Sequence, residues 1–170
     1  MEDVELAARC EARLRGLRAL AHDRVQRGAA PREAWRFFFE IAERRLHRFE
    51  RTHGRDLLTA LRGLEAAGVL ELGTSSASHA YLPFLAAIDP ALVDAQIAVG
   101  VRRHARCFGP APTGFWLPEC AYVAGLDAWL DRAGIGHFFV DAHAVRGAVL
   151  GTAAPLLTPA GLVAFPRDVE

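Results

Sequence analysis

The chain has 170 residues, of which 52% are hydrophobic, a composition typical of a globular protein rather than a disordered one. Its 20 basic and 20 acidic residues give a formal net charge of zero, so charge provides no reason to expect binding to nucleic acid or to a membrane. No apolar run approaches the length needed to span a bilayer, and the chain is long enough to bury one sizeable core.

The cysteines Cys10, Cys107 and Cys120 lie far apart in the sequence. Their spacing matches neither a disulfide framework nor a metal site, which favours a reducing compartment. The N-terminus begins with acidic residues and lacks the apolar segment of a signal peptide. We therefore expect a cytoplasmic location.

Residues 1–54 predict a helical segment. Apolar residues recur at helical spacing between residues 4 and 27, with arginine and glutamate at most other positions. A Gly-Ala-Ala-Pro stretch at residues 28–31 interrupts the pattern, and Pro31 suits the first turn of a second helix. That helix is expected to reach about Phe49, with an aromatic stripe including Trp35 and Phe38 in the core.

Residues 55–170 alternate between predicted helices and strands. Asp56 is expected to cap a helix that ends at Gly68, and Asp89 to begin a longer helix that ends near Cys107. Short apolar runs between helices predict strands, and this alternation is typical of parallel sheets with right-handed crossovers. The expected strands cover residues 69–72, 115–117, 138–140 and 162–165, and one more helix covers residues 125–133.

Polar side chains follow the first three predicted strands. His79 lies in the loop after the first strand, Glu119 follows the second, and Asp141 and His143 follow the third. Parallel strands present their C-terminal ends on one edge of the sheet, where α/β enzymes place their chemistry. We therefore expect these four side chains to converge.

Several motifs in the same order resemble glycoside hydrolase family 57, and most closely its 1,4-α-glucan branching-enzyme type, over residues 56–145. The resemblance implies an α/β fold in which residues 55–170 form an internal, partial piece of a parallel-stranded (β/α)7-type barrel. It also implies that residues 1–54 are an insertion-like segment that packs on this barrel. The motifs are Gly-Val-Leu-Glu-Leu at residues 68–72, Ser-His-Ala-Tyr-Leu-Pro at 78–83, Trp-Leu-Pro-Glu-Cys-Ala-Tyr at 116–122, Ala-Gly-Ile at 133–135 and Phe-Phe-Val-Asp-Ala-His at 138–143.

The resemblance implies that Glu119 is the nucleophile of a retaining glycosidase mechanism. An ionised carboxylate attacks the anomeric carbon, while a second carboxyl group about 5 Å away protonates the leaving oxygen. The pattern alone equally allows Glu119 to be a carboxylate stabilised by the dipole of the helix that follows.

Four residues are predicted to bind substrate: His79, Trp116, Asp141 and His143. Each also has a structural interpretation: a loop histidine bonded to backbone, a core tryptophan, or a turn that ends a strand. The neighbouring Cys120 is more typical of a buried structural cysteine than of a nucleophile.

The chain also departs from the family. The family's acid/base aspartate has no counterpart, because neither Asp141 nor Asp168 occupies its motif, and the family's opening His-x-His segment is absent. Ala80 and Ala124 differ from the residues expected in their loops. We therefore expect the isolated chain to be inactive and to need the missing barrel segments.

Three functions remain open. The first is an α-glucan-active branching enzyme, 4-α-glucanotransferase or hydrolase that needs no cofactor. The second is a metal-dependent polysaccharide deacetylase in which His79, Asp141 and His143 bind zinc, although the Trp-Leu-Pro-Glu motif argues against it. The third is a truncated chain without catalytic activity.

Overall fold

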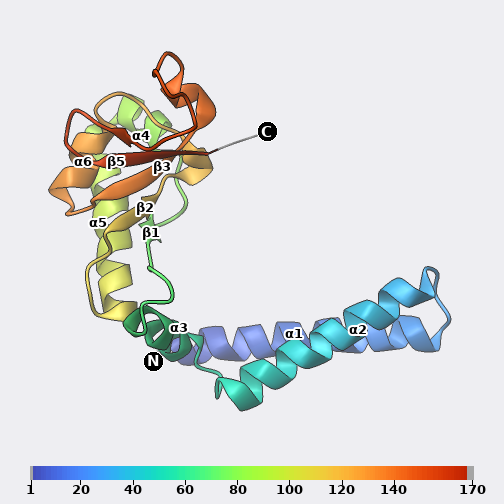
Figure 1. Ribbon diagram of the computed structural model, residues 1–170. Coiled ribbons are helices and arrows are strands. Elements are labelled where there is room, and N and C mark those ends of the chain that lie inside the picture. Colours follow the sequence, from blue (N-terminus) through green and yellow to red (C-terminus); the bar gives the residue numbers. More distant parts are fainter. Residues whose placement is uncertain (1, 168–170) are drawn as a thin grey trace. The chain divides into compact units, whose positions relative to one another are not determined.

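The computed structural model describes residues 2–167 (Figure 1). Contacts divide the chain into two compact units, Met1–Ala66 and Ala67–Glu170. The expected domain boundary after residue 54, and the packing of the first segment on the barrel, stay predictions. No helix in the described part of the chain is long and apolar enough to cross a membrane.

The first unit is helical, as the sequence predicts. Helix α1 (Glu2–Gln26) packs along α2 (Arg32–His47), which continues into the π-helical turn η1 (Arg48–Thr52). Helix α3 (Leu57–Ala66) follows, and the Asp56 side chain caps it by accepting a 3.0 Å hydrogen bond from the Thr59 backbone N–H.

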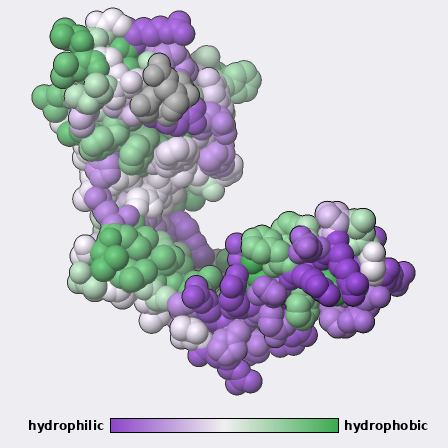
Figure 2. Space-filling view, turned by 45° about the vertical axis from the view of Figure 1, so that its right-hand side comes forward, coloured by the Kyte–Doolittle hydropathy of each residue, from purple (hydrophilic) through white to green (hydrophobic). Residues whose placement is uncertain are grey.

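The expected aromatic core of the second helix is only partly correct. Leu46 and Phe49 are buried, but Phe38 is 54% exposed and Trp35 is only half-buried. On the face in Figure 2, the region of this helix pair is mainly hydrophilic, with hydrophobic patches between the charged side chains. The first half of α2 has too few partners in its own unit to cover its aromatic rings.

An ion-pair network links α1 to the residues around η1. Glu11 accepts hydrogen bonds from Arg15 and Arg55, and Arg15 also contacts Glu50 at 2.6 Å. The hydrogen bond from Arg15 and the charge of Arg55, opposed by partial burial, lower the pKa of Glu11.

The second unit contains a five-stranded sheet in the order β1-β2-β3-β5-β4. Neighbouring strands are parallel except for the antiparallel pair β4 and β5, which confirms the predicted parallel α/β fold. The strands are β1 (Thr74–Ser75), β2 (Gly114–Trp116), β3 (His137–Asp141), β4 (Leu156–Leu157) and β5 (Val163–Arg167).

The helices of this unit lie between the strands in sequence. Helix α5 (Pro90–Phe108) begins at Asp89, whose side chain accepts a hydrogen bond from the Ala91 backbone N–H, as predicted. Helix α6 (Leu126–Arg132) also matches its prediction, whereas α4 (Leu82–Ile88) and β4 were not expected. The strand predicted at residues 69–72 is wrong, because the first strand to pair with β2 is Thr74–Ser75.

The two faces of the sheet differ in burial. Phe115, Phe138 and Ala164 occupy neighbouring register positions and belong to the core that the helices cover. The next register row holds Trp116 and Phe139, which are 41% and 36% exposed and lie on the opposite face. The interpretation of Trp116 as a core residue is therefore wrong.

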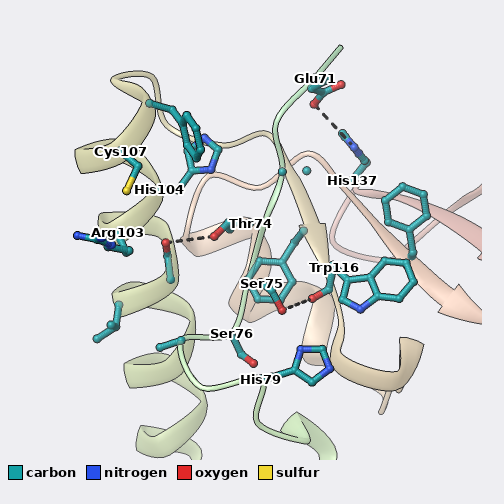
Figure 3. A pocket seen from close by; sticks show the side chains of 18 residues that line it. Glu71, Thr74, Ser75, Ser76, His79, Arg103, His104, Cys107, Trp116 and His137 are labelled. Atoms are coloured by element: carbon teal, nitrogen blue, oxygen red, sulfur yellow. Dashed lines mark hydrogen bonds and ion pairs between the residues drawn. The ribbon is translucent and has the colours of Figure 1, made fainter. Parts of the chain in front are cut away.

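Close packing of α5 on β1 requires a glycine at position 100. A Cβ atom at Gly100 would lie 2.1 Å from the Ser75 carbonyl oxygen. In addition, the Gly100 carbonyl accepts a 3.1 Å hydrogen bond from the Thr74 hydroxyl (Figure 3). The helix and the strand that precedes the His79 loop are thus held at fixed separation.

We expect Gly100→Ala to lower the free energy of unfolding by about 1–3 kcal/mol, because backbone atoms must move to admit the methyl group. Gly136→Ala is the matched control, since its Cβ would find only an ordinary contact of 3.8 Å with the Thr113 carbonyl oxygen. Urea unfolding of both variants measures the difference. Equal stability of the two variants would contradict the close approach.

Candidate active site

The predicted site residues gather at the C-terminal ends of the parallel strands, which we call the rim. His79 follows β1, Glu119 follows β2, and Asp141 ends β3 with His143 two residues later. Arg167 ends β5 and joins them, a residue that the sequence analysis did not identify. Parallel strand ends are where α/β folds place their active sites.

The loop that carries His79 is anchored to α5 by one residue, Gln96, through both its side chain and its backbone carbonyl. Gln96 accepts hydrogen bonds from the backbone N–H and the hydroxyl of Ser78, at 3.0 and 3.1 Å, and its carbonyl accepts from the Ala77 N–H. His79 itself has a left-handed backbone with φ of 55°. The helix therefore fixes where the imidazole emerges.

Glu119 sits in the tight 3-10 turn η2 (Pro118–Cys120) that ends β2. Glu119 and Cys120 have φ values of 58° and 52°, a conformation that costs non-glycine residues of the order of 1–3 kcal/mol and is concentrated at functional sites. The turn directs the carboxylate towards the previous loop, where Glu119 Oε1 lies 3.6 Å from His79 Nε2. The Glu119 side chain is 75% exposed, so within residues 2–167 it remains largely in contact with solvent.

Asp141 is held by three hydrogen bonds. Its Oδ2 accepts from the Arg167 guanidinium at 2.5 Å, and its Oδ1 accepts from His143 Nδ1 at 2.8 Å and from the His143 backbone N–H at 3.3 Å. The bond from Arg167 first, then those from His143, lower the pKa of Asp141 from 3.8 to about 2. Asp141 is thus a carboxylate near neutral pH and cannot donate a proton.

A cavity of about 880 Å³ lies around the edge strand β1, lined by α5 on one side and by residues of the exposed sheet face on the other (Figure 3). His79 lies at one end and the Glu71–His137 pair, with Oε1 and Nε2 3.8 Å apart, lies at the other. Trp116 lines this cavity, whereas Glu119 and Asp141 do not. The cavity therefore adjoins the rim but does not contain the predicted nucleophile.

Below the rim, aromatic rings cover the exposed sheet face. Trp116, Phe139 and Phe165 stand in one register row, with ring centroids 5.8 and 5.7 Å apart. Tryptophan and phenylalanine faces at this spacing offer an apolar surface on which a sugar ring can stack. Their position is consistent with the predicted binding role of Trp116, which stays a prediction.

Cys120 and Asp127 are buried near the turn that carries Glu119 in the sequence. The Cys120 side chain is buried, and burial raises the pKa of its thiol, which disfavours a nucleophilic thiolate. Asp127 is also buried and accepts hydrogen bonds from the Tyr122 hydroxyl and the Ala160 N–H. Burial alone would raise the pKa of Asp127, but the hydrogen bonds from Ala160, Thr158 and Tyr122 outweigh it and lower that pKa.

A zinc site formed by His79, Asp141 and His143 receives no support from this geometry. Within residues 2–167, no three histidine, cysteine or acidic side chains converge where they could hold a metal ion. Asp141 and His143 bind each other, and His79 faces Glu119. Asp168, the other aspartate considered, lies outside the described residues.

The parallel strands and the acidic rim define a piece of an α/β barrel that presents carboxylates at the carboxyl ends of its strands. Residues 7–170 match the sequence pattern of glycosyl hydrolase family 57, and the chain belongs to this family. The resemblance noted in the sequence is thereby confirmed.

Characterised relatives and solved structures agree with this membership. A 1,4-alpha-glucan branching enzyme of Thermococcus kodakarensis is 34% identical over 117 residues, which cover 60% of this chain and 17% of the relative. The alpha-amylase AmyC from Thermotoga maritima gives a TM-score of 0.79 at 34% identity, over 96% of this chain and 33% of that chain. The GH57-type branching enzyme from Pyrococcus horikoshii also gives 0.79, at 26% identity, over 94% and 33% of the two chains.

Proposed function

We propose that this chain is part of the catalytic barrel of a 1,4-α-glucan branching enzyme that works by a retaining mechanism, with Glu119 as the nucleophile. The observation that carries the proposal is the strained turn at Glu119, which directs its carboxylate to His79 at the rim. Membership of family 57 and the branching enzymes among its relatives support the same activity. By this activity the protein belongs to glycogen biosynthesis in the cytoplasm.

The geometry suits the first half of such a reaction. The Glu119 carboxylate attacks the anomeric carbon of an α-1,4-linked glucosyl unit and holds the cut chain as a glycosyl ester. His79, whose Nε2 lies 3.6 Å from Glu119 Oε1, orients that carboxylate or a sugar hydroxyl beside it. An acceptor hydroxyl of another glucan then attacks the same carbon, which breaks the ester bond to Glu119, and its proton passes to the acid group that protonated the leaving oxygen.

We propose that the proton donor is a group other than Asp141, supplied from elsewhere in the protein. The donor protonates the leaving oxygen, so it must carry a proton before the bond breaks. Asp141 does not, because Arg167 and His143 hold its pKa at about 2. The chain spans 17% of the length of the branching enzyme from Thermococcus and about a third of the solved structures. We propose that further barrel segments supply the acid and exclude water from Glu119.

Hydrolysis of α-glucan is the second candidate function. The similarity to the alpha-amylase AmyC, at 34% identity over 96% of this chain, favours it specifically. Both reactions share the glycosyl ester on Glu119 and differ only in whether water or a sugar hydroxyl is the acceptor. The same rim residues could therefore support either hydrolysis or transfer to a sugar hydroxyl.

We expect the isolated chain to bind maltoheptaose weakly, with a dissociation constant on the order of 1 mM or above, and to turn it over negligibly. The rim residues are present, but Glu119 is solvated, and within residues 2–167 no second acidic side chain is paired with it. Chemical-shift changes at the rim, followed by NMR, measure binding, and a branching assay measures turnover. Cellohexaose, a β-glucan, is the control ligand and should cause smaller shifts. Equal response to both sugars, or turnover comparable to that of a full-length family enzyme, would refute the proposal.

A further inference from the structure

We propose that Arg167 is a positioning residue for glucan binding: its guanidinium fixes the Asp141 carboxylate at the rim so that Asp141 accepts a hydrogen bond from a glucan hydroxyl. This inference rests on the proposed function and extends it to a residue and a contact that the family match alone does not assign.

The backbone places the two side chains together. Asp141 and Arg167 are register partners at the last positions of the parallel strands β3 and β5. Two residues earlier on the same strands, Phe139 and Phe165 stand on the exposed face, so the alternation of the strands puts Asp141 and Arg167 on that face too. The pair therefore stands directly above the aromatic row.

The hydrogen bonds leave Asp141 with capacity for a ligand. A carboxylate offers about four acceptor sites, two on each oxygen. His143 occupies Oδ1 with two donors, and Arg167 occupies one site on Oδ2. One site on Oδ2 remains, and the Asp141 side chain is still 20% exposed. A sugar hydroxyl can reach it without displacing either partner.

Arg167 also balances the negative charge of the rim. Among the described residues, the groups that interact with Asp141 are Arg167 from β5, His143 from the short turn η3 (Ala142–Val145) and Cys120 from η2. The hydrogen bond to Asp141 first, then the interactions with Cys120 and Glu119, raise the pKa of Arg167. The Arg167 cation thus interacts with both the Asp141 and the Glu119 carboxylates.

A purely structural role explains the pair less well. The strands β3 and β5 are already joined along five register positions, from His137 with Val163 to Asp141 with Arg167. The Arg167 side chain remains 48% exposed at the end of this ladder. A surface ion pair at such a place adds little to stability, whereas a fixed carboxylate there adds directionality to binding.

The test compares Arg167→Met, Arg167→Lys and Asp141→Asn in the 170-residue chain. We expect Arg167→Met and Asp141→Asn each to weaken maltoheptaose binding about tenfold, the double variant to be no weaker than either single one, and Arg167→Lys to recover part of the loss. Arg132→Met is the control, because it breaks an Arg–Asp pair on the helices, 3.2 Å from Asp94, in which the arginine is 57% exposed against 48% for Arg167. It should leave binding unchanged.

A second measurement does not depend on glucan. NMR titration of the Asp141 carboxyl should show its pKa rising from about 2 towards 3.8 in Arg167→Met and staying at about 2 in Arg132→Met. An unchanged Asp141 pKa, or full binding by Arg167→Met while the wild type binds glucan, overturns this inference and leaves the proposed function intact. Absence of binding by the wild type overturns both. Binding lost together with the folded NMR spectrum in all three rim variants would show a structural role and also overturn it.

Discussion

Replacing Glu119 with glutamine in the full catalytic domain is expected to reduce glucan transfer about a thousandfold or more, the scale seen when a covalent nucleophile is removed. Glutamine keeps the size of the side chain and its place in the strained turn, but it cannot form the glycosyl ester. A mechanism-based glycosyl inhibitor should label the wild-type domain at Glu119 and leave the variant unlabelled. Mass spectrometry of the digested protein measures both.

Two comparisons make this experiment specific. Asp94→Asn removes an exposed carboxylate on α5 that pairs with Arg132, so it should keep labelling and turnover. Unchanged thermal unfolding of Glu119→Gln would show that the loss is chemical. If the Glu119→Gln variant is still labelled, Glu119 is not the nucleophile.

The largest effect on stability is expected from Phe138→Ala. Phe138 is fully buried, stacks on Tyr122 with ring centroids 5.8 Å apart, and belongs to the core between the sheet and its helices. Truncation of a buried phenylalanine costs about 3–5 kcal/mol, a large part of the stability of a typical domain. Much of the variant should therefore be unfolded under mild denaturing conditions, as followed by urea titration.

Phe139→Ala is the matched control for this change. Phe139 is the next residue along β3 but points to the other face, where it is partly exposed beside Trp116 and Phe165. We expect a loss of less than about 1.5 kcal/mol, because less apolar area returns to water. Similar losses in both variants would contradict the assignment of a covered and an open face to the sheet.

The sequence predicted most of the fold because its strongest signals are local. Asp56 and Asp89 precede helices and cap them, and the runs at residues 115–117 and 138–140 become central strands. The first strand was misplaced because the apolar run at residues 69–72 looks more like a strand than Thr74 and Ser75 do. Which residues form a strand depends on the neighbouring strand as well as on local sequence. Here Thr74 pairs with Phe115 of β2, and Ser75 pairs with Trp116.

The sequence predicted those site residues that lie next to a strand end it had also predicted. Glu119 and Asp141 were found because they lie at the ends of recognisable strands, and His79 because its loop was recognised although the strand before it was misplaced. The structure places His79 opposite Glu119. Arg167 was missed because the last strand was expected to end at Phe165, two residues too early. The pairing of Asp141 with Arg167 depends on β5 lying next to β3, a sheet order that no local pattern contains.

The anchoring of the His79 loop by Gln96 carries a consequence for protein engineering. Gln96, seventeen residues after His79, holds this loop in two ways: its side-chain oxygen accepts both hydrogen bonds from Ser78, and its backbone carbonyl accepts the one from Ala77. Substitutions at Gln96 in libraries that vary α5 are therefore expected to remove the Ser78 hydrogen bonds and to displace the imidazole, although Gln96 is not one of the proposed sugar-binding residues. Activity screens of such libraries should keep Gln96 unchanged.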